Sequence, residues 1–484
     1  MPGDRAVSRR HFLRAAGAAG LGVAASASPL LAACGGGGDG AGDGGGDEIK
    51  VGVIAPFTGT GTSIGEVVNS ALTAAVQQVN STGGVEGRKV RVLLRDSASD
   101  PANAARLYGE LAGQADVVGL LWCGAPGFTA VLPQVRRDGI PVIAVFEDPY
   151  SAGLLHPAGD EAGRSVFQAS VPDVFVKEVL ADYASNDRGY TSAALMHAPA
   201  VPPPGDTRGH FEQAFEKAGV AVTGVETFST GDQDFTAQLT RLRAARPQVL
   251  YLDGLSDETG AIATALAGMG AAYVDTPTAK GAEWHPHVFG SFRGVNYLWA
   301  DVAQEAAKVG SITAWHIGGL PFLPTFSIAG WMRKFVGKEP RGGEEACADG
   351  LYTLVRGVQK AGSGDRRRVV EGIETMGPLR FASVDFGYEA GRHHAVTKDD
   401  VVVLTLERLR GPAPTDPPYE LGQEWKDLDG LARKAAAATL LARPTMAANR
   451  RAHPDLVEDV LRRGYGTQCT KHADGSLGKE CKIH

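Results

Sequence analysis

The stretch that decides the fold is IKVGVIAPF, residues 49–57, followed by TGTGTSIGEVVNSALTAAVQQV, residues 58–79. The first segment is a short, largely apolar run rich in β-branched residues, which is typical of a buried strand. In the second segment apolar residues recur at three- and four-residue intervals, at positions 64, 67, 68, 71, 72, 75, 76 and 79. This spacing predicts a helix, with Ser63 and Glu66 as a capping box and Gly83-Gly84 just past its end.

The same alternation of strand and helix continues along the chain. Asp100 and Pro101 predict the start of another helix, because aspartate caps helices and proline fits the first helical position. Further strands are predicted at residues 90–94, 117–121, 140–146, 193–196, 220–225, 249–252 and 287–289. This alternation predicts an α/β fold of two lobes, each a doubly wound parallel sheet covered by helices on both faces. Ligands of such sheets bind beyond the carboxyl ends of the strands.

The N-terminus carries two export signals. The sequence Ser8-Arg9-Arg10-His11-Phe12-Leu13 precedes a weakly apolar stretch that ends in Leu31-Ala32-Ala33-Cys34. The first motif resembles a twin-arginine export signal, and the second resembles the lipobox of bacterial lipoprotein precursors. We therefore expect residues 1–33 to be a signal peptide and Cys34 to carry the lipid that anchors an extracytoplasmic protein to the bacterial cell membrane. The alternative, a transmembrane helix, is disfavoured by Arg14 and by the high glycine, alanine and serine content.

Composition limits the partners of the mature chain. Residues 34–47 are nearly all glycine and aspartate, which predicts a flexible tether. Removal of residues 1–33 takes away four arginines and one aspartate, so the net charge changes from −7 to −10. An acidic chain without a basic run is not expected to bind nucleic acid.

The C-terminal part differs in composition from the rest. A proline-rich linker at residues 411–418 begins an extension that covers residues 411–484. Residues 431–463 are alanine-rich and basic in part, and we expect them to be helical. The extension packs on a lobe, contacts a membrane or envelope partner, or is partly disordered.

Five segments in one order carry a family resemblance: Val51–Gly59, Asn80–Gly84, Asp96–Pro101, Gly139–Ile143 and Asp234–Leu239. Their order and spacing resemble the leucine/isoleucine/valine-binding branch of the periplasmic binding proteins, the receptors of ABC importers. Members of this family are two-lobed receptors that close around a small-molecule ligand and deliver it to an ABC transporter permease.

The resemblance covers residues 48–410 and implies a domain organisation. Three crossovers are expected near residues 168, 318 and 378. Lobe 1 then comprises residues 48–168 plus 319–377, and lobe 2 comprises residues 169–318 plus 378–410. The resemblance also implies a monomer that needs no cofactor, with the ligand in a cleft between the lobes.

The residues that would name the ligand depart from the family pattern. The family binds the α-carboxylate of an amino acid with hydroxyls and amides of lobe 1, and uses a tyrosine and an acid of lobe 2. In this chain the serine-rich loop falls on Gly124-Ala125-Pro126, the next loop on Phe146-Glu147-Asp148, the tyrosine on Asp206 and the acid on Phe292. The first loop lacks hydroxyls, and the carboxylates of the second would repel a ligand carboxylate.

We therefore expect a ligand without a free carboxylate, such as an amine, an amide, a polyol or a cation-bearing molecule. In the alternative interpretation, Glu147 and Asp148 cap the following segment or lie solvated on the rim. Aromatic side chains near these loops are candidate walls, although core packing is their commoner role. The predicted ligand contacts are Thr58, Ser63, Trp122, Gly124, Ala125, Phe146, Glu147, Asp148, Asp206 and Phe292.

Five cysteines are too few for a fold that depends on disulfides. The resemblance implies a disulfide from the Asp96–Pro101 segment to the residue before the serine loop. Ser99 occupies the first place and Cys123 the second, so Cys123 is a buried thiol or pairs with Cys347.

The terminal tail carries a second cysteine pair. Cys469 and Cys481 are expected to form a disulfide in an oxidising compartment. Together with His472 and His484 they would also suit zinc, but we expect no metal. The histidines at 285, 287, 393 and 394 are likewise expected to be surface or supporting residues.

Catalysis has little support in the sequence. No His-Glu-x-x-His motif or phosphate-binding Gly-x-x-x-x-Gly-Lys-[Ser/Thr] loop occurs, and we do not expect an enzyme. The rival to transport is a sensing module that binds the same kind of ligand and signals to a membrane partner.

Overall fold

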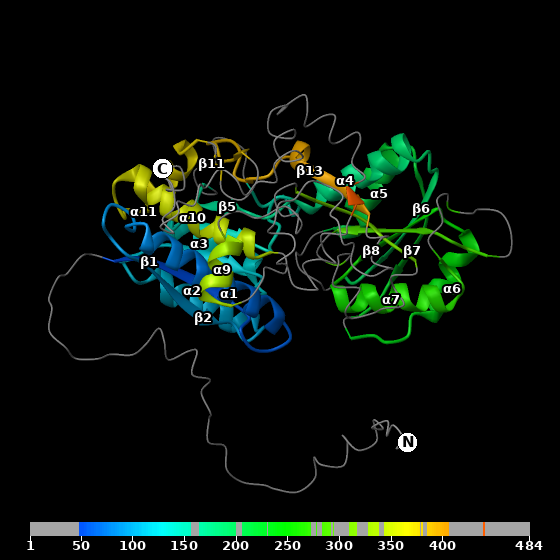
Figure 1. Ribbon diagram of the computed structural model, residues 1–484, viewed down its shortest axis with the longest axis horizontal. Coiled ribbons are helices and arrows are strands. Elements are labelled where there is room, and N and C mark those ends of the chain that lie inside the picture. The colour runs from blue at the N-terminus through cyan, green and yellow to red at the C-terminus, as the bar shows by residue number, and fades with distance from the viewer. Residues whose placement is uncertain are drawn as a thin grey trace, which may run out of the picture. The chain divides into compact units, whose positions relative to one another are not determined.

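The computed structural model describes residues 48–155, 164–199, 206–229, 231–272, 277, 283–291, 294, 309–316, 328–337, 343–377, 379–380, 385–405 and 439–440. The predicted fold class is confirmed, because these residues form two α/β lobes, each built on five parallel strands (Figure 1). The signal peptide, the tether, Cys34, Cys469 and Cys481 lie outside the described residues.

The first sheet follows the strands predicted from the sequence. Its order is β2-β1-β3-β4-β5 and every pairing is parallel. The strands are β1 (Ile49–Ala55), β2 (Val90–Asp96), β3 (Val117–Cys123), β4 (Val142–Val145) and β5 (Val166–Gln168). The helices between them are α1 (Thr62–Ser81), α2 (Pro101–Ala112) and α3 (Phe128–Asp138). Asp100 caps α2 with Pro101 at its first position, as predicted.

Both faces of this sheet are buried, which explains why its strands are continuous apolar runs. Val51 and Val53 belong to a core shared with α1, whereas Ile54 and Leu120 belong to a second core shared with α2 and α3. All four side chains are fully inaccessible to solvent.

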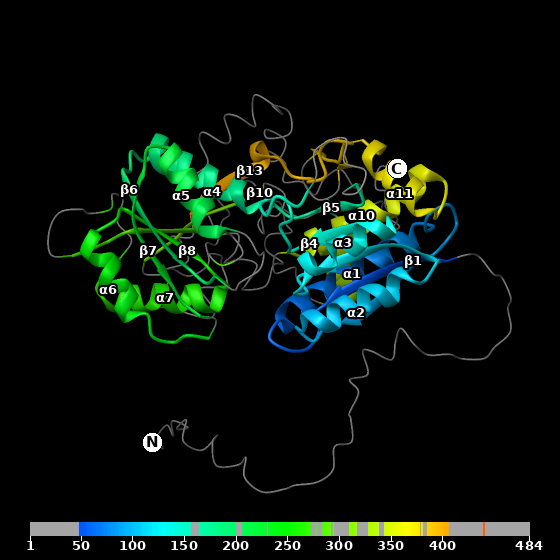
Figure 2. The same ribbon diagram turned by 180° about the vertical axis from the view of Figure 1, so that it is seen from behind.

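Three helices from much later in the chain join the first lobe: α9 (Ile328–Phe335), α10 (Glu344–Ala361) and α11 (Arg366–Thr375). In Figures 1 and 2 these yellow helices lie among the blue and cyan elements. α10 packs against α1, β3 and β4, and α11 packs against α10. The helix α10 therefore borders the ends of two strands whose loops were predicted to bind ligand.

The second sheet has the order β14-β13-β10-β9-β8-β6-β7. Its five parallel strands are β6 (Ser192–His197), β7 (Ala221–Thr227), β8 (Val249–Asp253), β9 (His287–Ser291) and β10 (Ile312–His316). Two further strands, β13 (Val401–Thr405) and β14 (Thr439–Leu440), are added antiparallel at one edge. Helices α4 (Asp173–Asp182), α5 (Thr207–Lys217), α6 (Thr236–Ala245) and α7 (Ser256–Gly268) cover the sheet.

Short elements complete the described chain. A π-helix (Tyr183–Asp187) continues α4, a 3-10 helix (Lys398–Asp400) precedes β13, and β11 (Leu379–Arg380) pairs with β12 (Asp385–Phe386). Across the described part of the chain, no helix has both the length and the apolar character needed to cross a membrane.

Two local predictions were wrong. The predicted capping box does not form, because α1 begins at Thr62 after Gly61, and no side chain caps it. The predicted helix at residues 431–463 includes β14, a strand that pairs with Leu404 and Thr405 of β13. An open sheet edge offers unpaired backbone groups, and here the C-terminal extension satisfies part of one.

Candidate functional site

The carboxyl ends of β1, β2, β3 and β4 lie at one edge of the first sheet, because these strands run parallel. The loops that leave this edge cover residues 56–61, 97–100, 124–127 and 146–151. The predicted ligand contacts of lobe 1 lie on these loops or directly beside them. Open α/β sheets bind their ligands at such an edge.

Thr58 holds the loop after β1 in place. Its hydroxyl donates to Asp96 Oδ2 at 2.6 Å, and its backbone N–H donates to Asp96 Oδ1 at 3.1 Å. Partial burial acts to raise the pKa of Asp96, but hydrogen bonds from Thr58 and from the Ala98 amide outweigh it and lower that pKa. The hydroxyl proton of Thr58 is therefore committed to Asp96, so Thr58 shapes the loop that it was predicted to line.

Ser99 provides a second link between the same two loops. Its hydroxyl accepts from Gly61 N–H at 3.0 Å and donates to the Thr58 carbonyl at 3.3 Å. Gly59 has φ of +87°, and a Cβ there would lie 2.7 Å from the Ala98 carbonyl oxygen. Only glycine fits this position without strain. Hydrogen bonds thus connect the loops at the place where the family resemblance implied a cysteine.

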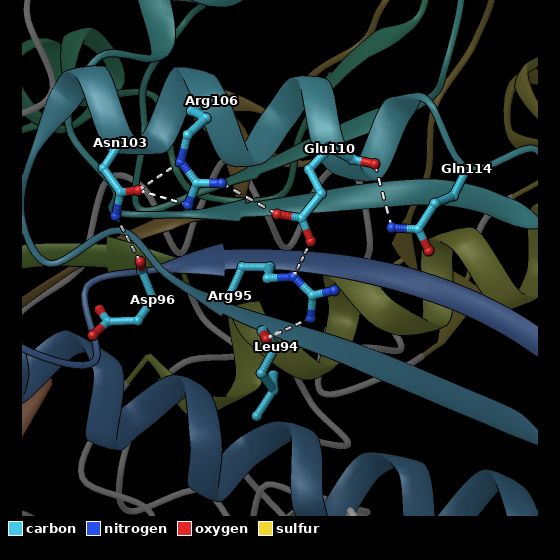
Figure 3. Close-up of polar contacts among 7 residues, drawn as sticks. All are labelled: Leu94, Arg95, Asp96, Asn103, Arg106, Glu110 and Gln114. Carbon is cyan, nitrogen blue, oxygen red and sulfur yellow. Dashed lines mark hydrogen bonds and ion pairs between the residues drawn. The ribbon is translucent and has the colours of Figure 1, made fainter.

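Helix α2 holds Asp96 from the other side (Figure 3). Asn103 donates from Nδ2 to the Asp96 carbonyl at 3.0 Å, and Arg106 donates to Asn103 Oδ1 at 2.9 Å. Farther along the helix, Glu110 accepts from both Arg106 and Arg95. These contacts fasten the end of β2 to α2, and so the Asp96 carboxylate is fixed where Thr58 can reach it.

Ser63 is the predicted contact whose hydroxyl stays accessible to a solute. It is the second residue of α1 and is exposed, and its hydroxyl makes no hydrogen bond within the described residues. The neighbouring Thr62 hydroxyl donates instead to the Gly59 carbonyl at 2.6 Å. The start of a helix carries partial positive charge, so Ser63 adds a donor at a position that favours an electron-rich ligand group.

The loop after β3 offers few groups to a ligand. Trp122 is completely buried, donates from Nε1 to the Ala125 carbonyl at 2.6 Å, and packs against Phe128. Ala125 is equally buried, and the Gly124 N–H donates to the Val145 carbonyl at 3.0 Å. Trp122 and Ala125 are therefore core residues in this structure, which is the commoner role weighed for Trp122 in the sequence.

Phe146 keeps part of its surface exposed and joins two elements of the site. It is a non-glycine residue at φ of +66°, a strained backbone conformation. Its ring lies against Gly343, where an added Cβ would come within 2.9 Å of the Phe146 Cε1 atom. Gly343 precedes α10, so the loop after β4 and the start of α10 are in contact.

Asp148 does not present its charge to a ligand, which corrects the expectation from the sequence. Its carboxylate is 4% exposed; Oδ1 accepts from the Ser151 N–H and from Gln168 Nε2, both at 2.9 Å. Oδ2 accepts from the Asp173 N–H at 2.6 Å. Burial raises the pKa of Asp148, although these hydrogen bonds oppose the rise. The Ser151 N–H contact agrees with the alternative interpretation, in which Asp148 caps the following segment.

Glu147 is also withdrawn from solvent. It is 2% exposed, and its backbone carbonyl accepts from the Ser170 hydroxyl at 2.8 Å. The two carboxylates therefore do not form an acidic rim, and they carry no argument for a cationic ligand.

In lobe 2, Asp206 caps a helix. Its Oδ1 accepts from the Gly209 N–H at 2.8 Å at the start of α5. Asp206 is exposed, and this capping role accounts for its side chain. Phe292 lies outside the described residues.

The sequence did not single out Lys177 on α4. Its side chain is fully buried and pairs with Asp173 and, at 3.2 Å, with Asp253 at the end of β8. The Lys177 ammonium also lies 5.7 Å from the centre of the Tyr251 ring. A lysine within an amphipathic helix is normally solvated, so only the tertiary fold reveals this buried ion pair.

His197 was also missed. It ends β6, pairs in register with Asp253 and is 7% exposed; within the described residues its Nδ1 has no hydrogen-bond partner. Burial lowers the pKa of His197, and the Asp253 charge opposes that shift only in part. A neutral imidazole at the carboxyl end of a strand can donate or accept a hydrogen bond. Its position at the end of an apolar run is the sequence signal that could have identified it.

Two chain segments meet at Gln168, where a crossover was predicted. The Gln168 N–H donates to the His393 carbonyl at 2.7 Å, and the Ala395 N–H donates to the Gln168 carbonyl at 3.0 Å. The Gln168 side chain accepts from the Tyr150 N–H at 2.9 Å and also binds Asp148, as described above. Gln168 therefore ties the loop after β4 to the segment that leads into α4.

The histidines considered as metal ligands have other partners. His393 contacts Glu374 Oε1 at 3.1 Å, and His394 contacts the Val396 carbonyl at 2.9 Å. His285 pairs with Glu283, and His287 bonds to the Tyr190 hydroxyl. Among the residues that the structure describes, no group of histidine, cysteine, aspartate or glutamate is arranged to hold a metal ion.

The comparisons with known proteins agree with this architecture. A family model described as periplasmic binding protein matches residues 48–407, which include the described sheets except β14. The chain belongs to the periplasmic binding protein family. This periplasmic binding protein is 29% identical over 229 residues to the Leu/Ile/Val-binding protein homolog 3 of Brucella melitensis. That match covers 46% of this chain and 59% of the relative's length.

Other matches extend over more of the chain. The Leu/Ile/Val-binding protein homolog 2 of Brucella abortus is 23% identical, over 71% of this periplasmic binding protein and 86% of the relative. A type 1 periplasmic binding protein from Bordetella pertussis has a TM-score of 0.62 at 21% identity, covering 74% of this chain and 96% of that one. A fatty acid ABC transporter substrate-binding protein from Thermomonospora curvata has a TM-score of 0.63 at 16% identity, covering 82% and 92%. Likeness at these identities shows a shared fold.

Proposed function

We propose that this protein is an extracytoplasmic solute receptor that captures a small polar molecule between its lobes and delivers it to an ABC importer. The family match across residues 48–407 is the observation that carries the proposal. The two export motifs that end at Cys34 support a lipid-anchored protein beside its membrane permease.

The ligand in this proposal lacks a free α-carboxylate. The loop after β3 contributes no side-chain donor, the Gly124 N–H already binds Val145, and Pro126 has no N–H to give. Ser63 on lobe 1 and the neutral His197 on lobe 2 offer hydrogen bonds suited to an amide or a polyol. Glu147 and Asp148 are buried and are not proposed as ligand contacts.

Related folds take chemically different ligands, so the fold does not choose among them. One neighbour is a branched-chain amino acid transporter substrate-binding protein from Streptococcus pneumoniae in complex with isoleucine, and another is the fatty acid ABC transporter substrate-binding protein from Thermomonospora curvata. The local groups at the strand ends must therefore decide what this protein binds.

The proposed mechanism is closure of the two lobes around the solute. A ligand that touches both lobes stabilises the closed form by its extra contacts, and the permease then recognises that form. Gln168 and the segment at residues 393–395 are hydrogen-bonded to each other, and we place one part of the hinge there. No step in this mechanism requires bond making or breaking in the solute.

A ligand screen by thermal shift, followed by calorimetric titration, tests the proposal. An amide or a polyol should bind saturably, and Ser63→Ala should weaken its binding about two- to tenfold through loss of one hydrogen bond. Thr73→Ala, an exposed change on the same helix, is the matched control and should leave affinity unchanged. Tight binding of leucine or valine would contradict the ligand class.

Two further measurements separate transport from its rivals. Uptake of the radiolabelled solute should be lost in a deletion strain and restored by the wild-type gene. A sensing module would leave uptake intact, and an enzyme would return the solute chemically changed.

A further inference from the structure

Two buried cysteines from distant parts of the chain meet in the first lobe. Cys123 is the last residue of β3, and Cys347 is in the first turn of α10. Both are completely inaccessible to solvent and belong to one hydrophobic core. Gly350, one turn after Cys347, faces Leu121 and Val145, so Cys347 lies on the side of α10 that faces the end of β3, and both cysteines are free thiols in the structure.

The chemistry around this pair argues against a reactive nucleophile. Burial raises the pKa of the Cys347 thiol, and the hydrogen bond to Cys123 and the charges of Glu344 and Glu345 act in the same direction. Catalytic and redox-sensing cysteines are instead exposed, with their pKa lowered by nearby positive charge. A buried, touching pair without such activation suits a structural role.

We propose that Cys123 and Cys347 form a structural disulfide in the exported protein. The two thiols lose two protons and two electrons as one S–S bond forms. The electrons pass by thiol–disulfide exchange to an oxidised dithiol oxidoreductase outside the cytoplasm, which is reduced to its dithiol form. Because both sulfurs are buried in the folded lobe, the exchange requires transient local opening of α10 away from β3.

The cross-link would have a defined structural effect. Cys123 directly precedes the loop at residues 124–127, and Cys347 lies one turn after Gly343, which contacts Phe146. The disulfide therefore fastens two loops at the strand ends to α10, whatever solute the protein binds. It closes a loop on the order of 220 residues long, and long loops gain the most in the chain-entropy account of disulfide stabilisation.

This disulfide differs from the one implied by the family resemblance. That pairing would join Cys123 to position 99, which here is Ser99, bonded to Gly61 and Thr58. Cys123 is thus left for a different partner, and the fold supplies Cys347.

Peptide mapping of the full chain, exported by a bacterial host and digested without reduction, tests the proposal. The expected product is a pair of peptides joined through Cys123 and Cys347 that separates on reduction. Reduction during unfolding should lower the melting temperature by on the order of 5–10 °C. Cys123→Ala/Cys347→Ala should lose this response, whereas Cys469→Ala/Cys481→Ala should keep it.

Free thiols at Cys123 and Cys347 would contradict the proposal. The protein is first refolded in a glutathione redox buffer, then denatured and alkylated without reduction. If both Cys123 and Cys347 are alkylated, the disulfide does not form and the proposal fails. The same conclusion follows if either cysteine maps to a different partner. Ligand binding is not measured in this experiment, so its failure leaves the proposed receptor function untouched.

Discussion

Replacing Glu345 with glutamine should stabilise the protein above neutral pH, by an amount that shrinks as pH falls toward 4.5. Glu345 is the second residue of α10 and is 3% exposed. Its carboxylate accepts a hydrogen bond from the Gly343 N–H at 2.9 Å. Burial raises its pKa from 4.5 to about 7, and hydrogen bonds from the Glu345 and Gly343 backbone N–H groups oppose the rise only in part. Glutamine keeps the acceptor oxygen and carries no charge at any pH.

The raised pKa of Glu345 determines the sign and the size of its effect on the free energy of unfolding. The folded protein binds the Glu345 proton more tightly than the unfolded chain does, so the stabilisation is complete below pH 4.5 and is lost as pH rises through about 7. One pKa unit corresponds to about 1.4 kcal/mol, and the loss above pH 7 is therefore about 3 kcal/mol. Glu345→Gln should recover about this much at pH 8.

Urea unfolding followed by tryptophan fluorescence, at pH 5 and at pH 8, provides the assay. Glu371→Gln is the matched control, because Glu371 is an exposed glutamate on the neighbouring helix α11. Glu345→Gln should raise the free energy of unfolding by about 3 kcal/mol at pH 8 and by less than about 1 kcal/mol at pH 5. Glu371→Gln should change it at neither pH. An equal effect of Glu345→Gln at both pH values, or destabilisation at pH 8, would refute the reasoning.

Three further predictions address other parts of the chain. Asp148→Ala should destabilise the protein by about 2–4 kcal/mol in chemical denaturation, because it leaves three buried donors without their acceptor; full stability would show that these hydrogen bonds contribute nothing. Gly59→Ala should cost about 1–3 kcal/mol and weaken solute binding, whereas Gly153→Ala, also at positive φ but with open space around it, should cost less; equal costs would contradict the steric argument. Cys34→Ala should abolish metabolic labelling with palmitate and release the protein from the membrane fraction, and retention of the label would disprove the predicted anchor.

Much of the fold was predictable because buried parallel strands are strongly apolar. The runs at β1, β3 and β8 are continuous, and each ends at a change to turn-forming or polar residues. The three-residue strand β5 was missed because a run so short gives no periodic signal. The capping box at Ser63 does not form because α1 begins after Gly61, whose N–H binds Ser99, and that contact joins residues 38 positions apart in the chain.

The candidate site was less predictable than the fold. The sequence located the loops, because strand ends can be read from apolar runs, but it could not assign the side chains. Asp148 was predicted to contact the ligand, but its carboxylate binds Gln168 and Asp173, which belong to later segments of the chain. Lys177 was not singled out for the same reason, because its partner Asp253 lies 76 positions later in the chain. Roles that depend on long-range partners require the tertiary structure.

We propose that this protein holds one solute noncovalently at the strand ends of its lobes. Native mass spectrometry of the protein purified from its own cell envelope tests this most directly. We predict one small, polar molecule without a free carboxylate bound per chain, released intact on denaturation and held less well by Ser63→Ala than by Thr73→Ala. A protein that carries no solute, or a branched-chain amino acid that binds equally to both variants, would contradict the account.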